Sequence, residues 1–274
     1  MSTPLIPEKL YGIIGHPLAQ TLSPALHNWG FARLGVAAAY AAFPTPPEKL
    51  AAFIQAVRTL PIAGLSVTIP HKETVMPLLD AVAPSAQRAN AVNTLVWEDG
   101  LLVGHNTDVT GFVAPLVERE GLKSVLVLGA GGAAKAVLAG LSELGITDIV
   151  VTNRDLERAR KLAAQFGVSA VGWEERTGAC ADLVVNATPM GMKGKAEEDS
   201  PLPPGFWKPG QTAYDLVYNP RETLFLRQAA KARARVIDGL TMFAAQGAAQ
   251  FKLWTGLDLP MEEVRDLLAR ALYA

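Results

Sequence analysis

A glycine-rich segment near the middle of the chain, Gly129-Ala-Gly131-Gly-Ala-Ala134, follows an apolar run and opens a helical pattern. In a Rossmann-type unit the first glycine forms the tight turn after a strand, and the second lets the backbone approach a pyrophosphate. The third small residue, here Ala134, lets the helix pack closely on the strand, and the free N–H groups at the helix start favour phosphate. The segment therefore predicts a dinucleotide-binding loop, with a glycine-rich turn that binds nothing as the alternative.

The residues after the next predicted strand, Thr152-Asn153-Arg154-Asp155, stand where such a unit meets the adenosine ribose. An acidic residue at this place binds the 2′-hydroxyl of NAD, whereas an arginine accommodates the 2′-phosphate of NADP. Arg154 and Arg158 are one helical turn apart and could flank one phosphate, which favours NADP, while Asp155 leaves the use of NAD open. The alternatives are that Asp155 caps the following helix and that both arginines lie on a solvated face.

Polar residues also gather in the first 108 residues, in clusters at the ends of predicted strands. The clusters are Gly15-His-Pro-Leu-Ala-Gln-Thr21-Leu-Ser23-Pro-Ala-Leu-His27-Asn28, Gly64-Leu-Ser66-Val-Thr68-Ile-Pro-His71-Lys72-Glu73, Asn90-Ala-Val-Asn93-Thr94 and Gly104-His-Asn106-Thr107-Asp108. Taken alone, Lys72 could be an ordinary exposed lysine and Asp108 a helix cap. The histidines lack the spacing of metal ligands, so we expect no metal site and interpret them as surface or capping residues.

Composition narrows the classes of protein. The chain has 274 residues, of which 50% are hydrophobic and 19% charged, enough apolar matter for a substantial core. Its net charge of −1 disfavours a nucleic-acid partner.

The one cysteine, Cys180, is expected in the core; it cannot form an internal disulfide or a zinc cluster, which suits a reducing compartment. The start of the chain lacks a signal-peptide pattern, and the longest apolar region, Val125 to Leu141, is interrupted by glycines and Lys135. These features predict a soluble cytoplasmic protein without a membrane span.

Strand-like runs alternate with helical periodicity, which is typical of an α/β protein with parallel strands. The patterns predict strands at 10–15, 38–43, 65–69, 94–98, 101–103, 124–128, 148–152, 182–187, 212–217 and 236–237. They predict helices at 24–34 with Ser23 as N-cap, and at 46–60, 71–79, 109–120, from the glycine segment to 144, 156–166, 240–254 and 261–272. Asp99-Gly100 is a hairpin signal, and the stretch from Pro189 to Gly210 is expected to be a long loop.

The motifs together resemble those of the shikimate dehydrogenase family. Besides the glycine segment and the polar clusters, the resemblance includes Asn186-Ala-Thr188-Pro-Met-Gly191, Tyr214-Asp-Leu-Val-Tyr218-Asn-Pro220 and Asp238-Gly239 followed by Gln246. It implies two domains: an α/β substrate-binding domain at 1–108 and 239–274, with C-terminal helices returning to it, and a Rossmann-type NADP domain at 109–238. It also implies the reversible reduction of 3-dehydroshikimate by NADPH in aromatic amino-acid biosynthesis, by a monomer or homodimer.

The resemblance implies roles for individual residues. Lys72 and Asp108 would be the catalytic pair, because an ammonium can stabilise the charge that grows on a ketone oxygen and deliver a proton to it. Each polar group of a small triol carboxylate needs a polar partner. The implied substrate residues are Thr21, Ser23, Ser66, Thr68, Asn93, Tyr218 and Gln246. The implied cofactor residues are Gly129, Gly131, Gly132, Ala133, Asn153, Arg154, Arg158, Thr188, Val217, Gly239 and Met242, the last four at the nicotinamide end.

The chain departs from the family pattern at three positions. The family usually has serine where this chain has Thr21, asparagine where it has Ser66, and threonine where it has Asp155. These departures keep a quinate/shikimate dehydrogenase that uses NAD or NADP as an alternative. A non-catalytic nucleotide-binding regulator is a more distant alternative, since both Lys72 and Asp108 are present.

Overall fold

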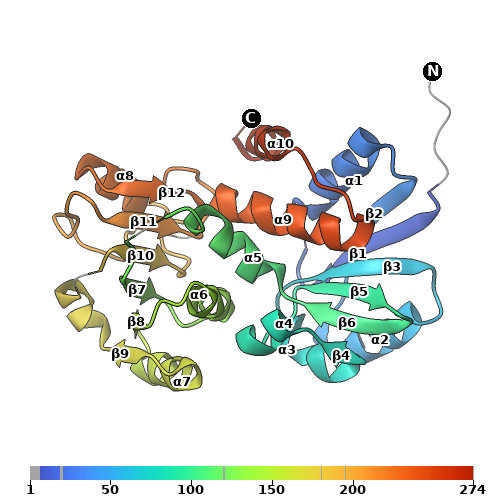
Figure 1. Ribbon diagram of the computed structural model, residues 1–274, viewed down its shortest axis with the longest axis horizontal. Helices are drawn as coiled ribbons and strands as arrows, with labels where there is room; N and C mark the ends of the chain where they lie inside the picture. The colour runs from blue at the N-terminus through green and yellow to red at the C-terminus, as the bar shows by residue number, and fades with distance from the viewer. Residues whose placement is uncertain (1–6, 19–20, 120, 180, 195, 274) are drawn as a thin grey trace. The chain divides into compact units, whose positions relative to one another are not determined.

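The computed structural model describes residues 7–18, 21–119, 121–179, 181–194 and 196–273. Contacts between Cα atoms divide the chain into two compact units (Figure 1). Unit 1 comprises Met1–Thr107 and Gln246–Ala271, and unit 2 comprises Asp108–Ala245 and Leu272–Ala274. Each unit is built on its own sheet, so the two are described separately.

Among its described residues, unit 1 has a six-stranded sheet in the order β2-β1-β3-β5-β6-β4. Strand β1 is parallel to β2 and β3, β5 is antiparallel to both β3 and β6, and β4 is parallel to β6. The strands are β1 (Lys9–Gly15), β2 (Ala38–Pro44), β3 (Ile62–Val67), β4 (Ala81–Val82), β5 (Thr94–Glu98) and β6 (Leu101–His105). The helices are α1 (Ser23–Leu34), η1 (Pro47–Lys49), α2 (Leu50–Val57), α3 (His71–Thr74), η2 (Met76–Leu78) and α4 (Pro84–Ala89). The unit also contains most of α9 (Gly239–Thr255) and α10 (Met261–Tyr273).

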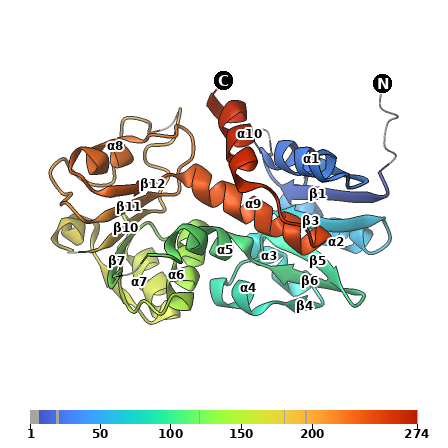
Figure 2. The ribbon, with the colours of Figure 1, turned by 45° about the horizontal axis from the view of Figure 1, so that its top comes forward.

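Helices cover both faces of this sheet, because successive side chains of a strand point to opposite faces. On one face Tyr11 of β1 packs on Phe31 of α1 and Trp254 of α9, with ring centroids 5.3 and 5.1 Å apart. On the other face Ile14 shares a buried cluster with Ile54 of α2. Figures 1 and 2 show α1 and α2 on opposite sides of β1 and β3.

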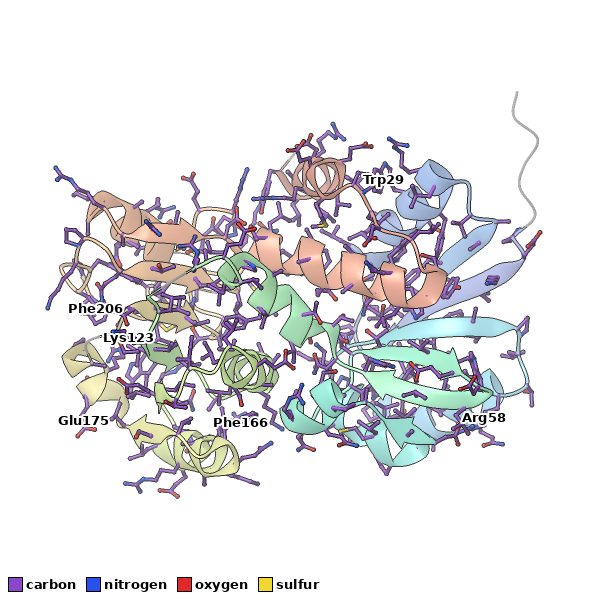
Figure 3. The ribbon with its side chains drawn as sticks, in the orientation of Figure 1. Trp29, Arg58, Lys123, Phe166, Glu175 and Phe206 are labelled. Carbon is purple, nitrogen blue, oxygen red and sulfur yellow. The ribbon has the colours of Figure 1, made fainter. Side chains whose placement is uncertain are left out.

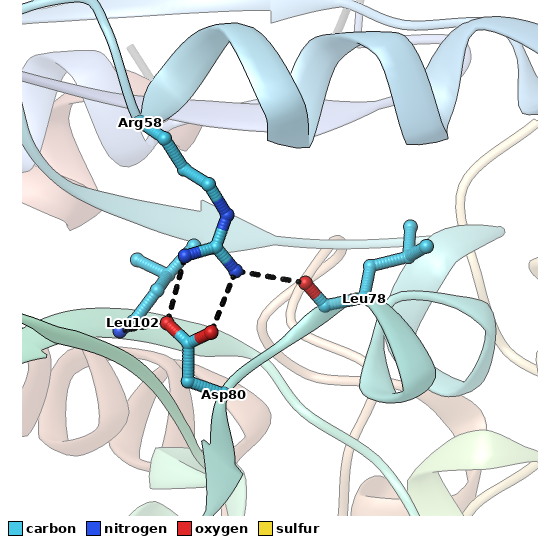
Figure 4. A network of polar contacts seen from close by, with 4 residues as sticks. All are labelled: Arg58, Leu78, Asp80 and Leu102. Atoms are coloured by element: carbon cyan, nitrogen blue, oxygen red, sulfur yellow. Dashed lines mark hydrogen bonds and ion pairs between the residues drawn. The ribbon is translucent and has the colours of Figure 1, made fainter.

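A polar contact ties the end of α2 to the segment before β4 (Figure 4). The Arg58 guanidinium donates to both carboxylate oxygens of Asp80, at 2.8 and 3.0 Å, and to the Leu78 carbonyl at 3.3 Å. Asp80 also accepts from the Leu102 backbone N–H at 2.8 Å. The hydrogen bonds from Arg58 and Leu102 lower the pKa of Asp80, so its carboxylate form is the one that holds these segments together.

In the part of unit 2 that the structure describes, six parallel strands run in the order β12-β11-β10-β7-β8-β9. This is the doubly wound order of dinucleotide-binding folds, and the order reverses between β7 and β10. The strands are β7 (Ser124–Leu128), β8 (Asp148–Thr152), β9 (Ser169–Val171), β10 (Leu183–Asn186), β11 (Thr212–Asp215) and β12 (Arg235–Ile237). The helices are α5 (Thr107–Val113), which begins at the unit boundary, η3 (Ala114–Leu116), α6 (Gly132–Glu143), α7 (Leu156–Phe166), η4 (Trp173–Gly178) and α8 (Leu224–Lys231).

Strand β7 is buried on both faces, as a continuous apolar run predicts. Val127 faces a cluster formed with α6 and α7, whereas Leu126 faces a second cluster formed with α8. Phe166 and Phe206, labelled in Figure 3, pack against the first and the second cluster respectively. Because the central strands lie between two layers, the ends of these strands are the part of the sheet left for a ligand.

The predicted α/β class is confirmed, and so are most elements. Strands form at the predicted places, the hairpin turns at Asp99 and Gly100 with φ of 49° and 80°, and both C-terminal helices are present. Among the described residues from Pro189 to Gly210 there is no helix or strand, as expected for the loop. Cys180, and Glu120 at the predicted end of a helix, lie outside the described residues.

Three helix predictions are wrong in detail. Ser23 is the first residue of α1 and not its N-cap; Leu22 is the cap, because its carbonyl accepts from the Leu26 N–H at 3.1 Å. The predicted helix 46–60 divides into η1 and α2, and helix 71–79 divides into α3 and η2. Pro77 lacks the N–H that the interior of an α-helix needs, so the chain forms a tighter 3₁₀ turn at η2.

Strand β3 ends at Val67 and not at Ile69, and helix α5 begins at Thr107 and not at Val109. The short elements β4, β9, α4 and α8 were not predicted. Helix α8 had a usable signal, since the Thr223 hydroxyl caps it by accepting from the Leu226 N–H.

Candidate active site

The polar clusters of unit 1 meet because their strands end at one edge of the sheet. Ser66, at the end of β3, pairs in register with Thr94, at the start of the antiparallel strand β5. His105, at the end of β6, pairs with Thr94 on its other side. Thr68 continues from β3, and its N–H donates to the Ile14 carbonyl of β1 at 2.9 Å. The predicted residues Ser66, Thr68 and Asn93 therefore belong to one edge of one sheet.

Asn93 is the best-connected of these residues. Its backbone carbonyl accepts from the Val67 N–H at 2.7 Å, and its N–H donates to the His105 carbonyl at 2.9 Å. Its side-chain Oδ1 accepts from the Thr107 N–H at 2.7 Å, and its Nδ2 donates to the Thr107 hydroxyl at 3.0 Å. Only 2% of Asn93 is exposed, so these contacts fix the amide from all sides.

The segments that carry the predicted catalytic pair are fastened beside Asn93. The Lys72 backbone carbonyl accepts from the Val92 N–H at 2.7 Å. Thr107, held by the Asn93 side chain, immediately precedes Asp108 in the first turn of α5. Lys72 and Asp108 are both half-buried. The Lys72 backbone is thus tied directly to Val92, and Asp108 follows the residue that the Asn93 side chain holds.

The first polar cluster forms a small loop at the start of α1. The Ser23 N–H donates to the Thr21 hydroxyl oxygen, and the two hydroxyl oxygens lie 3.4 Å apart. Ser23 is buried, with 8% of its surface exposed, and its side chain also hydrogen-bonds the Tyr40 hydroxyl. The dipole of α1 adds a partial positive charge near these hydroxyls, which suits a carboxylate.

Ser66 is buried, with 3% of its surface exposed. Its hydroxyl donates to Gln250 Oε1 at 2.9 Å and accepts from the Tyr40 hydroxyl at 2.6 Å. Gln246, one turn before Gln250 on α9, is also buried. Sequence reasoning named Ser66 and Gln246 but missed Tyr40 and Gln250, whose contacts join residues far apart in the chain.

In unit 2 the glycine segment lies where the strand order reverses. Gly129 follows β7 with φ of 113°, and a Cβ there would lie 2.9 Å from the Ala187 carbonyl oxygen after β10. Any side chain would therefore both strain the turn and collide with the neighbouring strand's exit. This geometry explains the glycine without a ligand.

Gly131 and Gly132 have a different reason to lack side chains. A Cβ at either position would meet no atom within 4 Å. Gly131 is the N-cap of α6 and gives it no side-chain cap, and Gly132 and Ala133 are exposed in its first turn. Open space above uncapped N–H groups is what the diphosphate of a dinucleotide requires, so these residues fit NADP.

The residues predicted to bind the adenosine end lie directly after β8 and at the start of α7. Asp155 is the N-cap of α7 and accepts from the Arg158 N–H at 3.2 Å, which confirms the capping alternative. The Asn153 amide donates to the Asp155 carbonyl at 3.1 Å. The Arg154 and Arg158 residues are exposed. The carboxylate of Asp155 is thus used as a helix cap, next in sequence to one of the two exposed arginines.

The residues predicted at the nicotinamide end are held by a buried pair, Asn186 and Asp215. Asn186 Oδ1 accepts from the N–H and the hydroxyl of Thr188, at 3.0 and 2.7 Å. Asp215 accepts from the Asn186 amide at 2.9 Å and from the Val217 N–H at 3.0 Å. Thr188 and Val217 are thereby placed by two adjacent strand ends.

Asp215 is fully buried, and two opposing effects act on the pKa of its carboxyl group. Burial raises the pKa of Asp215 to about 7, against the hydrogen bonds from Thr223, Val217 and Asn186 that favour the carboxylate. Its contact with the Thr223 hydroxyl is short, at 2.5 Å. Sequence reasoning quoted this residue within a motif but gave it no role.

The remaining predicted residues of unit 2 lie around the start of α9. A Cβ on Gly239 would lie 2.5 Å from the Val217 carbonyl oxygen, so the helix approaches this segment closely. Met242 packs on the first cluster of unit 2, and the Tyr218 ring lies 5.2 Å from that of Phe243. Tyr273 donates a hydrogen bond to the Tyr218 carbonyl, which fixes the backbone there.

The described residues contain neither a candidate membrane-spanning helix nor a candidate metal-binding cluster. No helix there is both long and apolar enough to cross a bilayer. Across the same ranges, no group of three or more His, Cys, Asp or Glu side chains is arranged to hold a metal ion.

Family models match most of the chain. Residues 13–95 match the shikimate dehydrogenase substrate binding domain, and 116–189 match shikimate / quinate 5-dehydrogenase. Residues 239–269 match the shikimate 5'-dehydrogenase C-terminal domain.

Full-length relatives are similar to the chain over almost its whole length. A protein of Oleidesulfovibrio alaskensis named shikimate dehydrogenase (NADP(+)) is 57% identical, over 99% of both chains. One of the same name from Maridesulfovibrio salexigens is 48% identical, over 97% of this chain and 98% of its own.

Solved structures give the same picture. Shikimate 5-dehydrogenase from Thermus thermophilus, in complex with NADP(H) and shikimate, is 41% identical with a TM-score of 0.87, over 96% of this chain and all of its own. Quinate dehydrogenase from Corynebacterium glutamicum, in complex with NAD, is 32% identical with a TM-score of 0.90, over 96% and 99%.

Proposed function

This chain belongs to the shikimate dehydrogenase family, and we propose that it catalyses the reversible NADPH-dependent reduction of 3-dehydroshikimate to shikimate. The identity of 57% over 99% of both chains to a relative named shikimate dehydrogenase (NADP(+)) carries this proposal. The resemblance predicted from the sequence motifs is confirmed by these comparisons. The reaction belongs to aromatic amino-acid biosynthesis.

The proposed division of labour follows the two units. Residues 1–108 and 239–274 would bind the substrate, and residues 109–238 would bind NADP. The strand-end cluster around Asn93 supports the first assignment, and the glycine segment at the reversal of strand order supports the second.

Lys72 and Asp108 are the proposed catalytic residues. Bound NADPH would supply the hydride. The Lys72 ammonium would stabilise the negative charge that develops on the substrate ketone oxygen and hold the proton delivered to it. Asp108 would orient the ammonium. The fastening of both segments beside Asn93 supports this pairing of roles.

Substrate binding would use hydroxyl and amide groups. Thr21 and Ser23, beside the start of α1, would hold the carboxylate, because hydroxyls and a helix N-terminus favour an anion. The other proposed residues would bind the ring hydroxyls or orient the ring; they are Ser66, Thr68, Asn93, Tyr218 and Gln246.

The cofactor would be held along the carboxyl edge of the second sheet. The open space at Gly131 and Gly132 supports a diphosphate site beside Gly129 and Ala133, and the exposed Arg154 and Arg158 with Asn153 would bind the 2′-phosphate end. Thr188, Val217, Gly239 and Met242 would line the nicotinamide end.

A steady-state assay with four substrate and cofactor combinations tests this function. Shikimate with NADP+ should give the highest kcat/KM, and quinate or NAD+ should lower it. A preference for quinate with NAD+ would favour the second candidate, a quinate/shikimate dehydrogenase. The similarity to the NAD-bound quinate dehydrogenase, together with Asp155 beside the arginines, keeps that candidate in view.

We also propose a cytoplasmic location, because a single cysteine suits a reducing compartment. The chain would act as a monomer or homodimer, which analytical ultracentrifugation distinguishes.

A further inference from the structure

Gln250 is a buried amide at the centre of the polar cluster in unit 1. It lies on α9 and is 2% exposed. Its Oε1 faces the Ser66 hydroxyl at 2.9 Å and His27 Nε2 at 3.3 Å. Its Nε2 faces the Asn93 carbonyl at 3.1 Å and the Thr94 hydroxyl at 2.9 Å. One side chain therefore joins the ends of β3 and β5 to helix α1.

The orientation of this amide is fixed by the backbone. The Asn93 carbonyl oxygen can only accept a hydrogen bond, so the Gln250 atom facing it must be the nitrogen. Oε1 must then accept from both Ser66 and His27. Burial supports this arrangement, since it lowers the pKa of His27 to about 3 and keeps the ring neutral, with its proton on Nε2.

The direction of every neighbouring hydrogen bond follows from that orientation. Ser66 spends its single proton on Gln250 Oε1, so it must accept from the Tyr40 hydroxyl at 2.6 Å. On the other side the Thr94 hydroxyl accepts from Gln250 Nε2, so its own proton goes to Asn93 Oδ1 at 2.7 Å.

The hydrogen bonds that run from Gln250 through Thr94 and Asn93 end at Thr107, the residue before Asp108. Asn93 Oδ1, which accepts from Thr94, also accepts from the Thr107 N–H at 2.7 Å. The Asn93 amide is therefore held with its oxygen toward Thr94 and the start of α5. Its Nδ2 donates to the Thr107 hydroxyl at 3.0 Å.

We propose that Gln250 is a positioning residue of the substrate site, which acts through Thr94 to hold the Asn93 side chain in place together with Thr107. This inference rests on the proposed function, in which Asn93 binds the substrate. Gln250 itself would not touch the substrate; it would fix the direction of the Thr94 hydroxyl and so maintain the hydrogen bond from Thr94 to Asn93 Oδ1. Removing it leaves the Asn93 carbonyl and the Thr94 hydroxyl without their buried partner. The Thr94 hydroxyl can then turn away from Asn93 Oδ1, so the Asn93 side chain keeps its contacts with Thr107 and loses the hydrogen bond from Thr94.

Two substitutions interrupt the hydrogen-bond relay from Gln250 through Thr94 to Asn93 at different residues. A third substitution, outside the relay, is the control. Gln250→Met keeps the length of the side chain and removes its hydrogen bonds, and Thr94→Val removes only the hydroxyl between Gln250 and Asn93. Lys252→Met, on the exposed side of the same helix, is the control. Each variant and the double variant Gln250→Met/Thr94→Val is assayed for kcat and for the KM of shikimate and of NADP+, with the melting temperature recorded.

We expect each single variant to raise the KM of shikimate about tenfold, the factor that follows from leaving one buried polar group unpaired. The KM of NADP+ should stay within about twofold, because its proposed residues lie in unit 2. The double variant should resemble the single variants, since both break one relay. A merely structural role would lower the melting temperature without this split between the two KM values.

Several results would overturn the inference. They are an unchanged KM for shikimate in either folded variant, equal effects on both KM values, or multiplied effects in the double variant. If Gln250→Met does not fold, Thr94→Val decides, and failure of both to fold would make the cluster structural and refute a positioning role. A wild-type protein inactive on shikimate would refute the proposed function as well, whereas an active wild type with unchanged variants would refute Gln250 alone.

Discussion

Lys72 and Asp108, the proposed catalytic residues, lie in segments that are held by nearby hydrogen bonds. Lys72 is fastened through its carbonyl to Val92, and Asp108 follows a threonine whose N–H is held by Asn93. Both anchors lie within one residue of each other in the chain. A change at either anchor would therefore move one member of the proposed pair relative to the substrate residues of the same sheet edge.

Lys72→Ala should lower kcat by roughly 10²–10⁴-fold, the usual contribution of general acid–base catalysis. The Kd of NADP+ should change little, because the lysine is not among the proposed cofactor residues. Steady-state kinetics and a fluorescence titration measure the two quantities. Lys252→Ala, at an exposed ion pair, is the control; an undiminished kcat in Lys72→Ala would remove the lysine from its proposed role.

Asp215 is the residue whose charge should couple the fold to pH. Its pKa is raised from 3.8 to about 7 by burial, so the folded state holds this proton at a pH where the unfolded chain has lost it. The stabilisation is complete below the unfolded pKa and is lost as the pH rises through the folded one. The free energy of unfolding should fall across this window.

Asp215→Asn removes that titration and keeps a neutral group of similar shape. Urea denaturation at a series of pH values should show the wild type losing up to about 1.4 kcal/mol per pH unit more than the variant as the pH rises toward 7. Parallel curves for the two proteins would show that Asp215 is already ionised throughout, held by its hydrogen bonds.

Among the elements, the loop between β7 and α6 contains glycines that are needed for two different reasons. Gly129 is needed by the fold, since its φ is 113° and a Cβ would collide with the exit of β10. Gly132 has room for a Cβ, so the fold does not require it. We expect the proposed cofactor diphosphate, which would approach the start of α6 closely, to require a glycine at this position.

Gly129→Ala should therefore lower the free energy of unfolding by about 1–3 kcal/mol. Gly132→Ala should leave it unchanged or raise it by up to about 1 kcal/mol, because alanine favours a helix. The second variant should instead raise the Kd of NADP+ about tenfold or more, which corresponds to about 1.4 kcal/mol of lost contact. Unfolding and titration experiments on both variants measure this contrast, and a Gly132→Ala variant that binds NADP+ as the wild type does would contradict it.

The sequence patterns predicted elements well where one local cause dominates. The run Ser124–Leu128 is apolar throughout and forms a strand buried on both faces, and Asp99-Gly100 forms the expected turn. The patterns failed where hydrogen-bond geometry determines the residue at which a helix begins or ends. A proline without an N–H ended the α-helical turn before η2, and the Leu22 carbonyl, not the Ser23 hydroxyl, starts α1.

The candidate site was predictable in its residue types and not in its internal contacts. Motif resemblance named Ser66 and Asn93, but nothing local marks Gln250, which meets Ser66 across 184 positions of sequence. Asn186 and Asp215 were visible within motifs, yet their pairing depends on two strands being neighbours in the sheet. Such contacts depend on which strands and helices become neighbours, and the local sequence patterns do not show this.

At the scale of the whole molecule, the chain divides into a unit with a mixed sheet and a unit with a parallel sheet. The proposed assignment gives the substrate to the first and the cofactor to the second. Hydrogen exchange with either ligand alone tests this directly, because a bound ligand slows exchange where it orders the backbone.

With NADP+ alone, exchange should slow at Gly131, Gly132 and Ala133, whose helix gives its first N–H groups no side-chain cap. With shikimate alone, it should slow in unit 1 around Asn93 and Ser23. Protection by NADP+ confined to unit 1, or by shikimate confined to unit 2, would contradict the assignment.

The most direct test of the central claim is the stoichiometry of one reaction. Wild-type protein is mixed with shikimate and NADP+, and the NADPH and the organic product are both quantified. We predict one molecule of 3-dehydroshikimate for each NADPH formed, with reversal when the products are supplied instead. Tight binding of NADP+ without any turnover of shikimate would contradict the claim.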